Sequence, residues 1–580
     1  MFPAANAYLN FPEPAGEPGL PFCRLREGVR GRDPSRGGLL PLPVGARAGP
    51  RSTLASTLNG TIPHLVRGEL RGRISIAGQD IQGLRPRDLA DRVGFLFQDF
   101  EAQLFSTNVA LEVAFGPENL GVPRAEIARR VDRCLRLARL EVLRHKAPAG
   151  LSGGQKQRLA LASVLALEPR ALVLDEPTSD LDPAGRRDLW EAIRRLREER
   201  ALTLLIIDPE TDEVGWADRL IVLDRGRVAL SGTPAELWSE GDRLDALGVK
   251  GFTLARLATA LGLAERWQDT DGAAAAIRAA GWRVAEGAAD RLRRADDERA
   301  SGEVLLDVED LTHRYPDGTE ALAGVSCAIR RGEFVAILGQ NGSGKTTLVK
   351  HFNGILTPTA GDIRLSGQSL RGQSLARLSR HVGLVFQNPD HQIFAERIRD
   401  EVAFGPRLQG LSENEVSRRV EEALEAVGLS DAGDLDPFIL TKGSRQRVAV
   451  ASTLATKPEL IILDEPTTGL DHRELLGMMA LIQRLNQAGH TILIVTHAMA
   501  VAATYVRRVI LMQDGRIVRE GPTREIFGNE SGLFDLGLTP PPVVQVGNRL
   551  GVPALTLEEL VGSLVQGTEG PRDKGTETRQ

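Results

Sequence analysis

The sequence predicts an α/β fold made of two copies of one domain, each built around a parallel sheet. The segment VLDEPTSDLD at 173–182 recurs as ILDEPTTGLD at 462–471, an offset of 289 residues. Within each copy, buried-strand runs such as 460–464 alternate with amphipathic helical segments, and this alternation is typical of parallel sheets. Ser412, with Glu415 three residues later, predicts a capping box that starts one of these helices.

Composition excludes several classes of protein. A chain of 580 residues is too long for one hydrophobic core. Its residues are 42% hydrophobic and 26% charged, which is too apolar a composition for a wholly disordered protein. A formal net charge of -5 gives no reason to expect nucleic acid as the main partner. Cys23, Cys134 and Cys327 are too few and too far apart for a disulfide framework or a cysteine-based zinc module. The sequence contains no run of about 18 apolar residues, the length that a membrane-spanning helix needs.

The repeat and local composition set the predicted boundaries. A small element at 247–262 recurs at 536–551, so each copy is expected to carry a small C-terminal extension. We predict five segments: 1–50, a degenerate or out-of-frame opening rich in proline and glycine and without lysine; 51–267, the first copy; 268–303, a charged linker; 304–566, the second copy; and 567–580, a disordered tail without Val, Ile, Leu or Phe.

The second copy contains a phosphate-binding loop. GQNGSGKTT at 339–347 follows an apolar strand and precedes an apolar helix, and it satisfies G-x-x-x-x-G-K-[ST]. Its glycines let backbone N–H groups curl around phosphate oxygens, and the helix N-terminus adds a positive dipole end. We expect Lys345 to reach the β- and γ-phosphates and Thr346 to bind Mg²⁺. The residues expected to hold the nucleotide here are Gly339, Gln340, Asn341, Gly342, Ser343, Gly344, Lys345, Thr346 and Thr347.

Two acidic residues end a strand about 120 residues after this loop. Asp464 at the strand end suits a contact with Mg²⁺ or its water, and Glu465 is placed to polarise an attacking water. An Asp-Glu pair after a strand is usually only a solvated turn. Its place downstream of a complete phosphate loop makes it a candidate catalytic pair.

Together, LSGGQ at 151–155, the two LDEPT segments and the phosphate loop resemble the nucleotide-binding domain of ATP-binding cassette (ABC) transporters, twice in one chain. The resemblance implies two P-loop NTPase domains, each with a helical subdomain that carries the signature, and ATP hydrolysis with Mg²⁺. It also implies that Tyr315 stacks on adenine and that Gln387 senses Mg²⁺ and links to a membrane subunit. His497 matches the switch histidine that contacts the γ-phosphate.

A narrower resemblance concerns the segments 97–117 and 386–406. FQDFEAQLFSTNVALEVAFGP and FQNPDHQIFAERIRDEVAFGP resemble the ATPases of energy-coupling-factor (ECF) importers, which take up vitamins and transition-metal ions. This implies two membrane partners, an integral coupling subunit and a substrate-binding subunit, and a peripheral location on the cytoplasmic side of the cell membrane. We expect the coupling surface to lie around Gln98–Gly116 and Gln387–Gly405 and to form grooves for membrane-subunit helices with Phe97, Phe105, Phe115, Phe386, Phe394 and Phe404.

The first copy departs from the pattern at its phosphate loop. GARAGPRST at 45–53 places Pro50 at the position of Gly344 and Arg51 at the position of Lys345. Proline removes a phosphate-facing N–H and fixes φ near -65°, and arginine lacks the compact ammonium of lysine. In addition, Pro209 stands where the second copy has His497.

The resemblance gives this asymmetry a meaning, because ABC domains pair head to tail with each ATP between one loop and the other copy's signature. One composite site joins 339–347 to Ser152, Gly153, Gly154 and Gln155, and the other joins 45–53 to the altered signature LTKGS at 440–444. We therefore expect one competent and one degenerate ATP site. The degenerate site is assigned to Gly45, Pro50, Arg51, Ser52, Gln98, Asp175, Glu176, Pro209, Thr441 and Gly443.

Two alternatives stay open from the sequence. One is a soluble, non-transport ABC ATPase acting on ribosomes or nucleic acid, although the charged helical hairpin of translation-type relatives and the zinc cysteines of repair-type relatives are missing. The other is a non-functional product of a damaged gene. Membrane-protein genes beside this one would favour the transporter.

Overall fold

The computed structural model confirms the predicted α/β class. The predicted segments 1–50 (apart from Pro50) and 567–580 lie outside the residues that it describes. Those residues are 50–66, 70–76, 78–178, 181, 183–199, 202–208, 210–297 and 302–566.

The second copy is built on a six-stranded sheet in which only the last strand is antiparallel. Every residue of β11, β15 and β16 is buried, as expected for apolar strands covered on both faces. In spatial order the strands are β14 (Val382–Val385), β15 (Leu460–Asp464), β16 (Thr491–Val495), β11 (Phe334–Leu338), β17 (Arg508–Gln513) and β18 (Arg516–Pro522). A second sheet of this copy is antiparallel and has four strands, in the order β10 (Glu320–Arg330), β9 (Val304–Arg314), β12 (Ala360–Leu365) and β13 (Gln368–Ser369).

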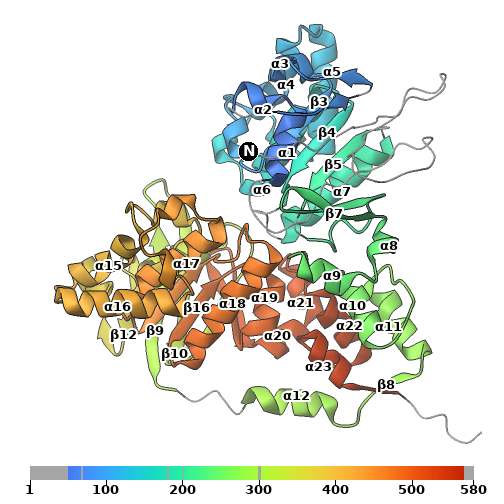
Figure 1. The fold of residues 1–580 in the computed structure, drawn as a ribbon. Coiled ribbons are helices and arrows are strands. Elements are labelled where there is room, and N and C mark those ends of the chain that lie inside the picture. The colour runs from blue at the N-terminus through green and yellow to red at the C-terminus, as the bar shows by residue number, and fades with distance from the viewer. Residues whose placement is uncertain are drawn as a thin grey trace, which may run out of the picture.

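Helices surround the main sheet of the second copy, and three of them form a separate helical subdomain at one side (Figure 1). The subdomain helices are α15 (Ile398–Leu408), α16 (Glu413–Ala426) and α17 (Lys442–Ala455). The other helices of this copy are α13 (Lys345–Phe352), α14 (Leu375–Leu378), α18 (His472–Gln487), α19 (Met499–Tyr505), α20 (Thr523–Gly528) and α21 (Glu530–Asp535).

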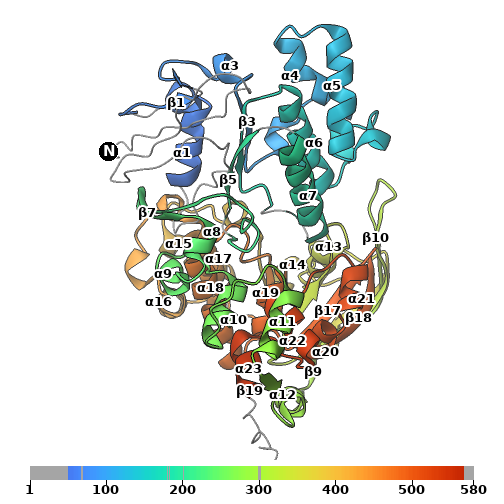
Figure 2. The same cartoon turned by 90° about the vertical axis from the view of Figure 1, so that its right-hand side faces the viewer.

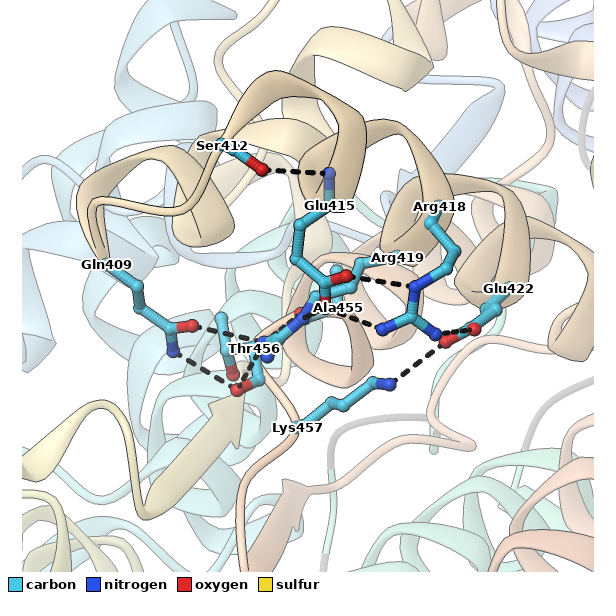
Figure 3. Close-up of polar contacts among 9 residues, drawn as sticks. All are labelled: Gln409, Ser412, Glu415, Arg418, Arg419, Glu422, Ala455, Thr456 and Lys457. Atoms are coloured by element: carbon cyan, nitrogen blue, oxygen red, sulfur yellow. Dashed lines mark hydrogen bonds and ion pairs between the residues drawn. The ribbon is translucent and has the colours of Figure 1, made fainter.

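The cap of α16 differs in part from its prediction (Figure 3). Ser412 Oγ accepts from Glu415 N at 3.4 Å, but the Glu415 carboxylate turns to Arg418 Nη2 at 2.6 Å and Arg419 Nε at 2.9 Å. Charge-assisted hydrogen bonds outweigh the neutral bond of a capping box, so only half of the box forms. Arg419 in turn donates to the carbonyl oxygen of Ala455, which ties α16 to the end of α17.

The first copy repeats the strand pattern over a smaller set of strands. β3 (Val93–Leu96), β4 (Ala171–Asp175) and β5 (Thr203–Ile207) form a parallel sheet, and β6 (Leu220–Asp224) pairs antiparallel with β7 (Arg227–Gly232). Among the described residues no strand occupies the place that β11 has between β16 and β17, so these two sheets stay separate. The segment aligned with β11, residues 38–45, lies outside that part of the chain.

The remaining elements of the first copy follow the repeat. Its helical subdomain consists of α4 (Val109–Asn119), α5 (Arg124–Leu137) and α6 (Gly153–Ala166), and α7 (Pro183–Glu199) corresponds to α18. The shorter elements are α1 (Pro50–Leu58), α2 (Thr61–His64), β1 (Ser75–Ile76), β2 (Gln79–Asp80), α3 (Pro86–Leu89), α8 (Pro234–Leu237) and α9 (Gly241–Ala246).

The C-terminal elements of the two copies pack on each other (Figures 1 and 2). Leu257 and Ile277 of the first copy share one buried cluster with Val543 and Val546 of the second. The elements are α10 (Thr253–Ala260), α11 (Thr270–Ala279), β8 (Trp282–Val284) and α12 (Ala288–Asp297) from the first copy, and α22 (Pro542–Leu550), α23 (Leu557–Gly562) and β19 (Leu564–Gln566) from the second.

This packing changes the expectation for the segment 268–303. The sequence predicts a linker there, but α11 buries Ala273, Ala274 and Ile277, and β8 pairs antiparallel with β19. The alanines are small enough to let α11 lie close against α22, so much of the segment is folded.

Candidate functional site

The loop between β11 and α13 has the curled backbone that its glycines predict. Gly344 has a φ of 97°, and a Cβ atom at this position would lie 2.5 Å from the carbonyl oxygen of Ala321. Lys345 is buried, and its Nζ donates to the carbonyl oxygens of Gly339 at 2.9 Å and Gln340 at 2.8 Å. The ammonium group therefore lies inside the loop, beside the backbone that would surround a phosphate.

Other loop residues line or flank the same place. Ser343 Oγ is buried and has no hydrogen-bond partner among the described residues. Thr347 Oγ1 lies 3.1 Å from the Tyr315 hydroxyl, which places the predicted adenine-stacking ring beside the loop. Gln340 donates to the carbonyl oxygen of Leu536, while Asn341 and Gly342 are exposed.

Asp464 ends β15 opposite the start of α13. Its Oδ2 accepts from Thr346 Oγ1 at 3.2 Å, and its Oδ1 is buried without a partner in the described structure. Burial and the charge of Glu465 raise the pKa of Asp464 to about 6, against the opposing effects of Thr346 and Lys345. A carboxylate oxygen with an unused lone pair beside a hydroxyl is the oxygen donor set that Mg²⁺ prefers, so these residues fit the predicted ion.

Glu465 and His497 form a buried pair at the ends of neighbouring strands. Glu465 has a φ of 49°, and its N–H donates to the carbonyl oxygen of Val495 at 2.8 Å. Its Oε1 lies 2.9 Å from His497 Nδ1. A left-handed backbone at a residue other than glycine is a strain that clusters at functional sites. Gln387, after β14, is exposed and makes no hydrogen bond to Asp464 or Glu465.

The first copy reproduces the carboxylate end of the site. Glu176 has a φ of 47°, its N–H donates to the carbonyl oxygen of Ile207, and its Oε2 accepts from Gln98 Nε2 at 3.0 Å. Asp175 is buried at the end of β4. The carboxylates of both copies are thus held by the same strand-end geometry.

The phosphate end of the first copy differs. Helix α1 begins at Pro50, a residue type that suits the first position of a helix. However, a proline ring fixes φ near -65° and cannot adopt the 97° of Gly344. The first copy therefore cannot form a phosphate loop with the backbone of the second-copy loop. Ser52 is half-buried on α1, whereas Gly45 and Pro209 lie outside the described residues.

The two signature segments have different surroundings. Ser152 caps α6 in a full capping box with Gln155, and within the described residues its hydroxyl makes no hydrogen bond to an acidic side chain. Thr441 caps α17, but its hydroxyl donates to Glu474 Oε1 at 2.8 Å. A Cβ atom on Gly443 would lie 2.6 Å from Glu474 Cδ. Sequence reasoning missed this carboxylate, although the first copy has Gly185 at the aligned position.

The structure does not join the predicted composite site. Within the residues described, no hydrogen bond or ion pair connects the signature 151–155 to the loop 339–347. Instead, Arg186 Nη2 lies 3.4 Å from His497 Nε2, Arg187 donates to Thr539, and Arg473 donates to the carbonyl oxygen of Ala246. The closed head-to-tail arrangement therefore stays a prediction. Sequence reasoning also missed Arg186. Its one signal in the sequence is a difference between the copies, because the second copy has Leu475 at the aligned position.

An acidic cluster lies where the first copy lacks the switch histidine. Burial and the charge of Glu213 raise the pKa of Asp208, while the Lys250 ammonium lowers the pKa of Glu210. Thr178 Oγ1 lies 3.2 Å from Asp208 Oδ2 and 3.3 Å from Glu213 Oε2. In the sequence, the acidic residues within 208–213 were the signal of this cluster, because the aligned residues of the second copy are apolar or neutral.

Exposed phenylalanine pairs occur at matching places in both copies. Phe105 and Phe394 are 62% and 60% exposed, and each packs edge-on against a second exposed ring, Phe115 at 4.5 Å and Phe404 at 4.8 Å. Phe97 is also exposed, so five of the six predicted groove residues lie partly or largely in solvent, with Phe386 half-buried. No helix in the described part of the chain is long and apolar enough to cross a membrane.

Comparisons with known proteins agree with the repeat. The family described as ABC transporter matches residues 48–179 and 322–468. A protein of Caldanaerobacter subterraneus subsp. tengcongensis, named as a candidate ABC transporter ATP-binding protein, is 45% identical over 89% of this chain and 92% of its own length. A Methanosarcina acetivorans protein of the same description is 40% identical over 85% of this chain and 82% of its own. The solved structure of CbiO1 from Clostridium perfringens, described as part of the transporter complex CbiONQ, is 36% identical over 40% of this chain and 94% of its own, with a TM-score of 0.38.

Proposed function

The chain belongs to the ABC transporter ATP-binding proteins, which are P-loop ATPases, and on this premise we propose that it is the energy-coupling subunit of an ECF-type importer for a vitamin or a transition-metal ion. The proposal includes one competent and one degenerate composite ATP site. The observation that carries it is the assembly, in the second copy, of a curled phosphate loop, the Thr346–Asp464 pair and the Glu465–His497 pair.

These groups supply what phosphoryl transfer needs. Lys345 and the loop amides bind the phosphates. Thr346 and Asp464 would hold Mg²⁺, and the bound ion would neutralise phosphate charge. Glu465 orients the attacking water and accepts its proton while the water oxygen bonds to the γ-phosphorus and the bond to the bridging oxygen breaks. His497 is hydrogen-bonded to Glu465 through Nδ1 and orients that carboxylate, and Tyr315 stacks on adenine.

The trans signature completes the competent site in this proposal. Ser152, Gly153, Gly154 and Gln155 close over the γ-phosphate when ATP draws the two copies together. The N-terminus of α6, which begins at Gly153, offers backbone N–H groups and a positive dipole end to that phosphate. The second signature is less suited to a phosphate, because the Thr441 hydroxyl already donates to the Glu474 carboxylate. The negative charge of Glu474 would also repel a phosphate.

The membrane partners are proposed from the exposed phenylalanines. Two matched aromatic pairs, one in each copy, exceed what a free surface needs. A helix of an integral coupling subunit laid on each pair would bury it by the helix-in-groove mode. Gln387, which is exposed and precedes the second pair in sequence, is the proposed link between this contact and the Mg²⁺ site. The chain would then lie on the cytoplasmic face of the cell membrane.

The experiment that tests the function uses the full chain. ATP-dependent phosphate release should require Mg²⁺ and should be lost in Lys345→Ala, because the ammonium inside the loop is removed. When the chain is purified from membranes, integral membrane proteins should co-purify with it, and one of them should bind a vitamin or a transition-metal ion. Phosphate release that is equal in Lys345→Ala and wild type would overturn the competent site. Co-recovery of ribosomal proteins or nucleic acid instead of membrane proteins would overturn the importer.

A further inference from the structure

An arginine of the first copy contacts the site of the second copy. Arg186 lies near the start of α7, and its Nη2 is 3.4 Å from His497 Nε2. Its other two nitrogens are also used, since Nε donates to the carbonyl oxygen of Leu181 at 3.1 Å and Nη1 donates to Glu213 Oε1 at 3.3 Å. The guanidinium is therefore held in one orientation by its own copy and directed at His497.

This contact fixes the position of the proton on His497. A guanidinium has donors and no acceptor, so His497 Nε2 must accept with its lone pair. The imidazole proton is then on Nδ1, which donates to Glu465 Oε1 at 2.9 Å. Glu465 Oε2 lies 3.5 Å from Thr468 Oγ1 and keeps lone pairs for the proton of a water. The chain of donors thus runs from Arg186 through His497 to the carboxylate.

The first copy anchors the arginine with a partly buried carboxylate, that of Glu213. Glu213 Oε2 accepts from Trp190 Nε1 at 2.6 Å and from Thr178 Oγ1 at 3.3 Å, which leaves Glu213 Oε1 for Arg186. Burial disfavours the charged guanidinium, but the charges of Glu213, Glu210 and Asp208 outweigh it and raise the pKa of Arg186. The acidic cluster that replaces the missing switch histidine therefore has a use: it holds a cation at the competent site.

The arrangement is not symmetric. The aligned residue of the second copy is Leu475, which has no charge to offer, and the first copy has Pro209 in place of His497. The arginine and the histidine that it contacts occur at the same composite site, the one with the complete phosphate loop. A contact that merely joined the two copies would have no reason to follow this division.

We propose that Arg186 is a positioning residue that the first copy supplies to the ATP site of the second copy, where it acts through His497 on Glu465. This inference rests on the proposed function. Hydrolysis in the second copy then depends on the placement of α7 in the first copy, so the degenerate copy takes part in catalysis beyond its signature.

The test compares three variants of the full chain by steady-state phosphate release. Arg186→Ala should lower kcat by about 10²-fold, the effect of misplacing a catalytic group by about 1 Å, while KM for ATP stays unchanged and a thermal melt shows the chain folded at the assay temperature. Added guanidinium ion should restore part of the kcat of Arg186→Ala. Arg186→Lys should be intermediate, because one ammonium cannot serve Glu213, Leu181 and His497 together.

Arg187→Ala is the matched control. Arg187 is the next residue of α7 and also reaches the second copy, at Thr539, but it contacts no residue of the proposed site, so its kcat should equal that of wild type. A wild-type kcat in Arg186→Ala, a loss that guanidinium fails to restore, or an equal loss in Arg187→Ala would each overturn the inference. Failure of the proposed function is separate, because it would show as equal phosphate release in wild type and Lys345→Ala.

Discussion

At the scale of single residues, the two copies share a carboxylate and differ in what surrounds it. Glu176 and Glu465 have nearly the same φ, 47° and 49°, and each donates its N–H to the neighbouring strand. Glu465 faces a histidine, whereas Glu176 is hydrogen-bonded to Gln98. A carboxylate can polarise water only where a γ-phosphate is held within reach, so the phosphate loop decides which glutamate is used.

The first prediction separates these two glutamates. Glu465→Gln should abolish measurable phosphate release, because loss of a general base costs about 10²–10⁴-fold, and Glu176→Gln should leave most of it. Both substitutions keep the side-chain volume and remove only the charge, so each controls for the other. Equal loss of turnover in the two purified variants would show that the first-copy loop binds ATP despite Pro50.

The second prediction concerns the signature segments. Ser152→Ala should reduce turnover as Glu465→Gln does, because both serve one nucleotide across the interface. Thr441→Ala should be mild, since the Thr441 hydroxyl is already hydrogen-bonded to Glu474 Oε1. Phosphate release measured beside thermal unfolding distinguishes loss of function from loss of the helix cap, which each substitution costs at about 1 kcal/mol. The asymmetric assignment fails if Thr441→Ala is the more damaging change.

The third prediction follows from Asp464. Burial raises its pKa from 3.8 to about 6, so between these values the folded protein without cation holds a proton that the unfolded chain has released. The free energy of unfolding should therefore fall as pH rises through this range and be constant above it. Mg²⁺ competes with the proton, so its affinity should weaken about tenfold per unit below pH 6.

The measurement for Asp464 is the melting temperature with ATP, with and without Mg²⁺, across this pH range. Asp464→Asn is the control, because it cannot ionise and should remove both the pH dependence and the Mg²⁺ effect. An Mg²⁺ affinity that is the same below and above pH 6 in wild type would contradict the assignment of Asp464.

At the scale of elements, the proposed partner contact lies at the exposed aromatic pairs, which include Phe115 of α4 and Phe404 of α15. Phe394→Asp should weaken recovery with membranes and leave phosphate release by the isolated chain unchanged, because the ring is 60% exposed and belongs to none of the buried clusters. Phe534→Asp is the matched control, since Phe534 is also exposed, at 42%, but lies on α21. Membrane recovery can be followed by sedimentation with native membranes. Unchanged recovery of Phe394→Asp would exclude this surface.

The sequence predicts some elements better than others, because some depend on residues close together in the chain and others on contacts between distant residues. The loop 339–347 was predictable, because its glycines and Lys345 act within one turn of chain. The linker 268–303 was not, because Ala273 and Ile277 of α11 find their buried partners on α22, more than 260 residues away in sequence. The contact between Arg186 and His497 was invisible for the same reason, since it spans 311 residues and depends on how the copies are placed.

At the scale of the molecule, two kinds of contact join the copies in the part of the chain that the structure describes. One is polar, and it includes the contacts of α7 with the second copy, through Arg186 and Arg187, and the bond from Arg473 to the carbonyl oxygen of Ala246. The other is the C-terminal cluster, where α10 and α11 pack on α22 and β8 pairs with β19. The second is apolar and buried, so it can hold the copies together while the first changes with nucleotide. This arrangement would let the ATP sites open and close while the C-terminal cluster keeps the two copies together.

The last prediction tests that pairing. A protease site placed between residues 297 and 302 should let the chain be cut, and the two halves should stay together in gel filtration, because the C-terminal cluster needs no covalent link. Val546→Asp should separate the cut halves, since Val546 is fully buried in that cluster and an unpaired buried charge costs several kcal/mol. Val518→Asp is the control, because Val518 is 46% exposed on β18, and its halves should stay joined. Separation of the wild-type halves would show that the connecting segment, and not the cluster, holds the copies in place.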